Sequence, residues 1–271
     1  MPELPEVESV LRCLTEQQPS LIGRQVQKVQ ILRDSVVSGD REFFINTLSG
    51  ARCTNIFRHG KYLLFGFQHF RATNPPWMAL HLRMTGKLFL VSHLQAFERH
   101  TRFVLHLDQE LALRFDDPRA FGRVWLVDDP AEVTAGLGPD ALMIDQNQFV
   151  ERLSEHRRQL KPLLLDQGFV AGVGNIYADE TLFRAGLHPA LRSDSLSSDQ
   201  RKALYDALHN VMKQAVAAKG ANIDGVFEAG SFPVAVYGRE GALCSRCGSI
   251  IQKIRLGQRG THFCPICQPL H

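Results

Sequence analysis

Two cysteine pairs near the C-terminus constrain this chain more than any other feature. Two residues separate Cys244 from Cys247 and Cys264 from Cys267, and 16 residues lie between the pairs. Each pair can present two thiolates to one ion, and the spacer is long enough for a β-hairpin. Four sulfur ligands complete the tetrahedral shell of Zn²⁺ and leave no position for a catalytic water. We therefore expect one structural zinc ion; four unrelated thiols, a disulfide pair or a catalytic zinc are the alternatives.

The N-terminus and the hydropathy pattern indicate the compartment. The first six residues carry two acids and no basic region, which is not typical of a signal peptide. No apolar run approaches the roughly 18 residues that span a bilayer. We expect a cytosolic, reducing environment, in which clustered cysteines favour metal over disulfides. Cys13 and Cys53 have no partner at metal spacing, and we predict that they are core thiols.

Composition and charge narrow the class of protein and of partner. A chain of 271 residues, 44% hydrophobic and 22% charged, is neither disordered nor fibrous and suggests two domains. Its net charge of +3 is too small to indicate a partner. The segment from Cys244 to Cys267, however, contains four basic residues and no acid: Arg246, Lys253, Arg255 and Arg259. Such a local positive patch favours a polyanion.

The first half of the chain predicts one helix followed by an antiparallel β-structure. Residues 6–17 place Val7, Val10, Leu11 and Leu14 on one helical face after Pro5. Seven short β-rich runs then follow, separated by turn residues, a spacing typical of a sandwich or barrel. They are 26–32, 61–67, 78–83, 87–91, 102–107, 111–115 and 123–127.

The second half predicts helices. The pattern breaks at 129–138, and short helices are expected at 149–156, 160–166 and 176–185, the last with Asn175 as its N-cap. A capping box at Ser197–Gln200 opens a long helix that Gly220 ends. The domains expected are an N-terminal one at 1–132, a linker at 133–148, a helical domain at 149–240 and a cysteine module at 241–271.

The N-terminal residues can supply a nucleophile. A penultimate proline favours removal of Met1, which would expose the secondary amine of Pro2. An α-amino group ordinarily has a pKa of roughly 7.7–8.0, so part of it is neutral near neutral pH. A neutral amine can attack an aldehyde-like carbon and form an iminium, with Glu3 or Glu6 beside it as general acid or base. A plain helix entrance is the alternative explanation of these residues.

A series of motifs in order along the whole chain resembles the formamidopyrimidine-DNA glycosylases, base-excision repair enzymes for oxidised purines. Leu4 is closer to this branch than to the sister endonuclease VIII branch, which usually has glycine there. The motifs are Met1–Glu8, Gly60–Leu64, His81–Gly86, Asp117–Gly122, Leu163–Glu180, Val236–Gly241, and the cysteine module with Gln258–Thr261.

The resemblance implies four catalytic residues. Pro2 matches the proline that attacks C1′ of the damaged nucleotide and forms a Schiff base, after which β- and δ-elimination cut the strand. Glu3 matches the acid/base residue that protonates the sugar ring oxygen. Lys61 matches a lysine that contacts the lesion and assists β-elimination, although by itself it would be a solvated charge on a strand. Arg259 matches the hairpin arginine that binds the flanking phosphates and is linked to δ-elimination.

The resemblance also implies six DNA-binding residues. Met84, Arg119 and Phe121 stand where the family fills the hole that the everted nucleotide leaves, although pattern alone would place Met84 and Phe121 in the core. Asn175 begins a helix whose N–H groups would favour a phosphate. His81 and His100 match positions near the DNA backbone, where a structural role is the default for a histidine.

The implied fold class is α+β: an N-terminal β-sandwich with a leading helix, then a helical domain with a helix–two-turn–helix element and a four-cysteine zinc-finger hairpin. The implied cofactor is one structural Zn²⁺, and the partner is double-stranded DNA with oxidised bases or abasic sites. We expect a monomer of the bacterial cytosol or nucleoid that does not contact the membrane.

Two departures bear on specificity. Only residues 221–236 separate Gly220 from Tyr237, several fewer than in well-known members, whose longer loop covers everted 8-oxoguanine. Ala120 stands where the family often has a basic residue. Formamidopyrimidines, further-oxidised guanines or abasic sites are therefore expected substrates, with 8-oxoguanine in doubt.

Three rival functions remain to be compared. An endonuclease VIII-like enzyme would prefer oxidised pyrimidines on the same scaffold. A non-catalytic zinc-ribbon DNA-binding protein would not need Pro2, Glu3 and Lys61, all of which are present. A zinc hydrolase is disfavoured because four cysteines saturate the metal.

Overall fold

The computed structural model describes residues 2–69, 76–223, 225 and 229–270, which form two compact units. The first contains Pro2 and Glu6–Gly136, and the second contains Glu3–Pro5, Leu137–Asn222 and Ala229–His271. Each unit has its own apolar core. The three residues Glu3–Pro5 therefore pack with the C-terminal half of the chain.

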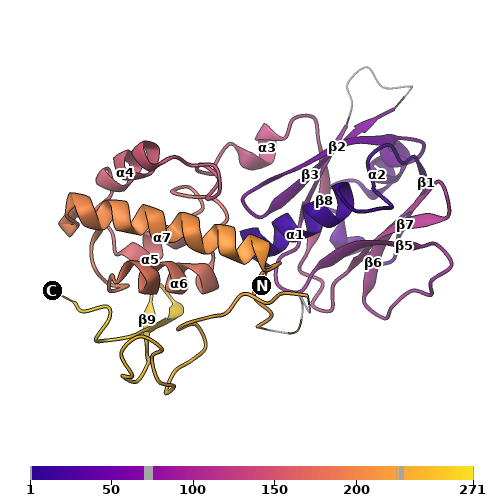
Figure 1. Ribbon diagram of the computed structural model, residues 1–271. Helices are drawn as coiled ribbons and strands as arrows, with labels where there is room; N and C mark the ends of the chain where they lie inside the picture. Colours follow the sequence, from indigo (N-terminus) through magenta and orange to yellow (C-terminus); the bar gives the residue numbers. More distant parts are fainter. Residues whose placement is uncertain (1, 70–75, 224, 226–228, 271) are drawn as a thin grey trace. The chain divides into compact units, whose positions relative to one another are not determined.

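The first unit is a sandwich of two four-stranded antiparallel sheets (Figure 1). One sheet has the order β1–β6–β7–β5, and the other has the order β2–β3–β4–β8. The strands of the first sheet are β1 (Val26–Ile31), β6 (Thr101–Leu107), β7 (Leu111–Asp116) and β5 (Lys87–Ser92). Those of the second are β2 (Arg52–His59), β3 (Tyr62–Gln68), β4 (Trp77–His81) and β8 (Arg123–Val127).

Apolar side chains from both sheets and from two helices form the core of this unit. Helix α1 (Leu4–Thr15) contributes Val7, Val10 and Leu14, as its apolar face predicts. Helix α2 (Arg41–Leu48), capped by the Asp40 carboxylate, adds Phe44 and Leu48. Two short elements, η1 (Asp34–Val36) and α3 (Ala131–Thr134), complete the unit.

The sandwich prediction is confirmed, but two of the longer elements of this unit, β2 and α2, were not expected. Strand β2 carries Arg52, Asn55 and Arg58 among its eight residues and so is not a β-rich run, and a register shift between Cys53 and Asn55 interrupts its pairing with β3. Its burial pattern is consequently irregular, with only Cys53 and Ile56 buried. The other unexpected element is α2, whose eight residues bury only two side chains.

The helices of the second unit pack around α6 (Asn175–Ala185). It contacts α5 (Leu160–Leu165), α7 (Ser198–Ala217) and the hairpin strand β10 (Arg259–Phe263), and eight of its residues are buried. Figure 1 shows α7 running past α6 and α4 (Gln146–Ser154). The short helix η2 (Ser193–Ser195) precedes α7, whose N-terminus has the predicted Ser197–Gln200 capping box.

The C-terminal module is a two-stranded hairpin of β9 (Gln252–Leu256) and β10. Gly257 and Gln258 form its turn with φ of +50° and +63°. The start of α4 lies three residues before the prediction, because Asp145 accepts a hydrogen bond from the Gln148 N–H and so caps the helix there.

Candidate active site and zinc centre

The carboxylate of Glu3 caps the N-terminus of α6. Its Oε1 accepts a hydrogen bond from the Ile176 N–H at 2.9 Å, and its Oε2 accepts one from the Tyr177 N–H at 3.4 Å. Glu3 is only 1% exposed. The positive end of the helix dipole favours a negative charge at this position. A residue beside the predicted nucleophile is thus fixed by a helix residue 173 positions away in the chain.

The prediction that Asn175 is the N-cap of this helix is wrong. Gly174 is the N-cap, and Asn175 is the first helical residue. The Asn175 side chain does not cap the helix; its buried Oδ1 has no hydrogen-bond partner among the described residues. Two of the N–H groups that we expected to favour a phosphate are occupied by Glu3.

Two glycines allow the N-terminal residues to approach α6 closely. A Cβ on Gly174 would lie 2.2 Å from Cδ of Glu3. A Cβ on Gly172 would lie 2.4 Å from Cδ1 of Leu4, and Gly172 has a φ of +104°. The Gly172 carbonyl also accepts a hydrogen bond from the Leu4 N–H at 3.1 Å. These glycines are required because the chain passes where a side chain would stand.

A buried ion pair that we did not predict joins the zinc hairpin to the helices. Lys161 on α5 and Asp179 on α6 are both fully buried, with Nζ and Oδ1 2.7 Å apart. Lys161 also donates to the Gly260 carbonyl at 2.8 Å, and the His262 N–H donates to Oδ2 of Asp179 at 2.9 Å. Burial lowers the pKa of Lys161, and the Asp179 carboxylate opposes that shift. A lysine inside the apolar run Leu160–Leu165 was the available signal.

The carboxylate of Glu180 fixes the segment just before the cysteine module. It accepts hydrogen bonds from the N–H groups of Ala235, Val236 and Tyr237 at 2.8, 2.9 and 2.9 Å. Burial raises the pKa of Glu180, and these three donors act in the opposite direction. The end of the 221–236 loop is thereby anchored to α6, whereas residues 224 and 226–228 of that loop lie outside the described part.

Arg259 is the first residue of β10 and is exposed. On the partner strand β9, Lys253 and Arg255 are also exposed, so the hairpin presents three cationic side chains to solvent. The ion pair of Lys253 with Glu240, at 3.4 Å, joins two exposed side chains and contributes little to stability. The predicted basic hairpin can therefore contact phosphates.

Lys61 is not a solvated charge on a strand. It lies in the turn between β2 and β3, and it is 8% exposed. His81, at the end of β4, is equally buried and accepts a hydrogen bond at Nδ1 from the Arg83 N–H at 2.9 Å. Burial, with the nearby charges of Arg83 and Lys61, lowers the pKa of His81 to about 3. His81 is therefore neutral near neutral pH, with its proton on Nε2.

His100 has a structural contact as well. Its Nδ1 lies 3.3 Å from Nη2 of Arg102, and its carbonyl accepts a hydrogen bond from the Asp117 N–H at 2.9 Å. Arg102 in turn donates to the Asp117 carbonyl at 2.6 Å. His100 thus supports the loop that begins at Asp117.

The residues predicted to fill a DNA void are not in the core. Phe121 is 48% exposed, Arg119 is exposed and Met84 is half-buried. The Arg119 guanidinium lies over the Phe121 ring, 4.7 Å from its centroid. Pattern alone would bury Met84 and Phe121, but their exposure leaves both side chains accessible to a partner.

The four module cysteines bring their sulfur atoms within 4.8 Å of one another. The sulfurs of Cys244 and Cys267 are 3.9 Å apart, and those of Cys247 and Cys264 are 3.5 Å apart. Tetrahedral Zn–S bonds of about 2.3 Å require sulfur–sulfur distances of about 3.8 Å, so the four thiols fit a zinc ion. Cys53 is buried as predicted, but Cys13 is exposed and is not a core thiol.

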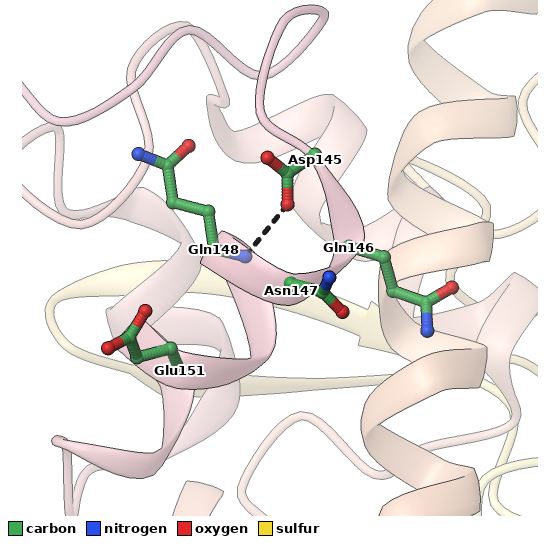
Figure 2. Close-up of a pocket in the computed structure, with 5 residues that line it drawn as sticks. All are labelled: Asp145, Gln146, Asn147, Gln148 and Glu151. Atoms are coloured by element: carbon green, nitrogen blue, oxygen red, sulfur yellow. Dashed lines mark hydrogen bonds between the residues drawn. The ribbon is translucent and has the colours of Figure 1, made fainter.

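A surface hollow of about 680 Å³ at the start of α4 contains none of the predicted site residues. Figure 2 shows its polar lining, in which the Asp145 carboxylate caps the helix at Gln148. The other lining residues are Gln146, Asn147 and Glu151. With two carboxylates and no cation in its lining, this hollow is a poor site for a polyanion.

Three family models match the chain in order. They are the formamidopyrimidine-DNA glycosylase N-terminal domain at residues 1–124, the H2TH domain of the same enzymes at 137–225, and a zinc finger found in FPG and IleRS at 241–270. The formamidopyrimidine-DNA glycosylase of Synechocystis is 41% identical over 286 aligned positions, covering 99% of both chains. That of Lactiplantibacillus plantarum is 38% identical, covering all of both chains.

The chain belongs to the formamidopyrimidine-DNA glycosylase family. The predicted family and fold class are confirmed, and the family's zinc finger coincides with the cysteine cluster. Solved structures of family members agree. Lactococcus lactis Fpg in complex with abasic-site DNA has a TM-score of 0.89 and 32% identity. The same protein with N7-benzyl-Fapy-dG DNA has a TM-score of 0.90 and 33% identity. Both comparisons cover 99% of this chain and 100% of the other.

The close approach at Gly174 predicts a large stability effect in this member of the family. Gly174→Ala should lower the free energy of unfolding by about 1–3 kcal/mol, because its Cβ overlaps the Glu3 carboxylate. Urea unfolding measures the change. Gly136→Ala is the matched control, since its Cβ meets no atom within 4 Å. In a Glu3→Ala background, Gly174→Ala should lower the free energy of unfolding by less, because the overlapping carboxylate is absent. An equal decrease in both backgrounds would contradict the overlap.

The cysteine cluster predicts one zinc ion per chain. Cys244→Ser should lose most of the metal and open residues 241–271 to proteolysis, because a thiolate ligand is gone. Elemental analysis and limited proteolysis test this. Cys13→Ser should keep full metal content, since Cys13 lies outside the cluster. Full zinc content in Cys244→Ser would show that the four thiols do not form the site.

Proposed function

We propose that this chain is a bifunctional DNA glycosylase and abasic-site lyase of base-excision repair, with Pro2 as its nucleophile. It removes oxidised purines, formamidopyrimidines foremost, and cuts the strand by β,δ-elimination. The observation that carries the assignment is the anchoring of Glu3 on α6, directly beside Pro2 in the chain. Family membership over the full length supports it.

The chemistry begins with removal of Met1. The freed secondary amine of Pro2 attacks C1′, the glycosidic bond breaks, and the base leaves with a proton. Opening of the sugar ring gives a cationic Schiff base on Pro2, which acts as an electron sink. Loss of a C2′ proton then expels the 3′ phosphate, and a second elimination expels the 5′ phosphate.

Glu3, Lys61 and Arg259 assist these steps. Glu3 moves protons at the sugar ring oxygen during ring opening. Lys61, buried in the β2–β3 turn, contacts the lesion and assists β-elimination. Arg259 on the exposed hairpin holds the flanking phosphates, and its charge favours the departure of the 5′ phosphate in the second elimination.

DNA binding distributes over both units. Met84, Arg119 and Phe121 fill the space of the everted nucleotide, and the Arg119 guanidinium bonds the orphaned base. Asn175 contacts the DNA backbone through the Nδ2 donors of its side-chain amide. His81 and His100 support the two loops near the DNA and contact its backbone. The zinc ion holds the hairpin in shape.

The lesion preference rests on the short 221–236 loop. The Synechocystis alignment has 286 positions against the 271 residues of this chain, so that relative carries residues that this chain lacks. A shorter cover over the everted base favours formamidopyrimidines and abasic sites over 8-oxoguanine.

The partner is double-stranded DNA, and the protein acts as a monomer in the bacterial cytosol or nucleoid. The exposed hairpin cations support a DNA partner, as do DNA complexes of similar structures. No helix in the described part of the chain is long and apolar enough to cross a membrane.

Borohydride trapping tests the nucleophile and the lesion preference together. Duplexes with a formamidopyrimidine, 8-oxoguanine, an oxidised pyrimidine or an abasic site should give a covalent adduct that maps to Pro2. The yield should be greatest for formamidopyrimidine and abasic DNA. Pro2→Gly, which replaces the secondary amine with a primary one, should trap poorly. Absence of any adduct, with Met1 removal verified by mass spectrometry, would refute the enzyme; a pyrimidine preference would favour an endonuclease VIII-like specificity.

Substitution of Glu3 separates chemistry from binding. Glu3→Gln should bind lesion DNA normally but excise the base at least about 100-fold more slowly, because the amide cannot transfer the proton. Single-turnover excision and a binding titration measure both quantities. Glu16→Gln, at an exposed position just after α1, is the control. Normal excision by Glu3→Gln would sink the assigned role.

A further inference from the structure

We propose that Thr85 and Asp117 are positioning residues that join two loops of the first unit into one rigid wedge. The loops carry Met84 on one side and Arg119 and Phe121 on the other. The inference rests on the proposed function, because it concerns the side chains assigned to the DNA void. Neither Thr85 nor Asp117 needs to touch DNA.

The first loop, residues 82–86, is closed by its own backbone. The Gly86 N–H donates to the Leu82 carbonyl at 3.1 Å, and the Arg83 N–H donates to Nδ1 of His81 at 2.9 Å. Arg83 has a left-handed φ of +57°, which few non-glycine residues adopt. The backbone next to Met84 is therefore held in an unusual conformation.

The second loop, residues 117–122, is organised by the Asp117 carboxylate, which is fully buried. Its Oδ2 accepts a hydrogen bond from the Gly122 N–H at 2.8 Å, and its Oδ1 accepts one from the Arg119 N–H at 3.2 Å. Ala120, with a left-handed φ of +55°, donates its N–H to the Asp117 carbonyl at 3.2 Å. One carboxylate thus binds both ends of the segment that carries Arg119 and Phe121.

The Thr85 hydroxyl links the two loops. It donates a hydrogen bond to Oδ1 of Asp117 and accepts one from the Arg119 N–H at 3.3 Å. The residue after Met84 therefore contacts the backbone of Arg119 and the carboxylate that organises the second loop. Hydrogen bonds to a buried charge are stronger than those between neutral groups.

A shared packing surface reinforces this link. A Cβ on Gly86 would lie 2.8 Å from Cε2 of Phe115, and one on Gly122 would lie 2.4 Å from Cζ of the same ring. Both loops thus rest directly on the fully buried Phe115 of β7. The Thr85–Asp117 hydrogen bond and the shared contact with Phe115 leave the two loops little freedom to move separately.

Rigidity matters because the void forms only when a base leaves the stack. If the loops move independently, inserting their side chains costs additional ordering entropy. Linked loops, already joined across the Thr85–Asp117 bond, have lost that freedom before DNA binds. The link should therefore accelerate base excision from duplex DNA and should not affect elimination at an abasic site in single-stranded DNA, where no opposite base is orphaned.

Thr85→Val removes the hydroxyl without changing the side-chain shape, and Thr85→Ser keeps the hydroxyl. Excision of formamidopyrimidine from a duplex under single turnover should fall about tenfold in Thr85→Val, since a hydrogen bond to a charged group is lost. The excision rate of Thr85→Ser should stay within about twofold of the wild-type rate. Both variants should cleave single-stranded abasic DNA at the wild-type rate.

Hydrogen exchange gives a readout that does not depend on activity. Peptides covering 117–122 should exchange faster in Thr85→Val than in wild type, and Thr85→Ser should match wild type. Unchanged exchange, or equal losses on duplex and single-stranded substrates, would overturn the proposal. If the wild-type protein itself neither excises nor traps any lesion, the proposed function fails, and the exchange experiment alone decides whether Thr85 joins the loops.

Discussion

The hydrogen bonds between the Glu3 carboxylate and the N-terminus of α6 are the constraint on which the position of the first residues of the chain depends. The first residues of a chain are poorly ordered unless something holds them in place. The N-terminus of a helix holds a carboxylate strongly and in a defined direction. The anchor requires space, which the missing side chains of Gly172 and Gly174 provide. Because Glu3 follows Pro2 directly, fixing the carboxylate also restricts where the proposed nucleophile can lie.

Through its acidic side chains, helix α6 also fixes α5, the hairpin strand β10 and the segment 235–237. Asp179 binds Lys161 and the β10 backbone, and Glu180 binds the segment at 235–237. Removing one partner of a buried ion pair strands a charge in the core, which ordinarily costs about 3–5 kcal/mol. Residues 175–185 therefore act as a common scaffold for the N-terminal carboxylate, the hairpin and the loop end. Changes in α6 should disturb all three together.

Features that depend on residues close together in the sequence could be predicted, and features that depend on distant residues could not. The other strands of the sandwich and the long α7 helix have local signals: β-rich runs between turn residues, an apolar helical face and the Ser197 capping box. Strand β2 does not, because Arg52, Asn55 and Arg58 keep its eight residues from forming a β-rich run. The cap of α6 was misassigned to Asn175 because the true capping group, Glu3, comes from the other end of the chain. No local rule includes a partner that distant.

Two predicted site residues, Lys61 and Phe121, differ in exposure from what their residue types suggest. Pattern alone would bury Phe121 and expose Lys61, yet the structure does the reverse. A lysine is buried only against a desolvation cost, and a phenylalanine is exposed only at a loss of apolar burial. Both reversals occur at motif positions, and the backbone around Phe121 is held by Asp117 in a conformation with a left-handed Ala120. Under the proposed function, DNA that covers the Phe121 ring returns the apolar burial that the free protein gives up there.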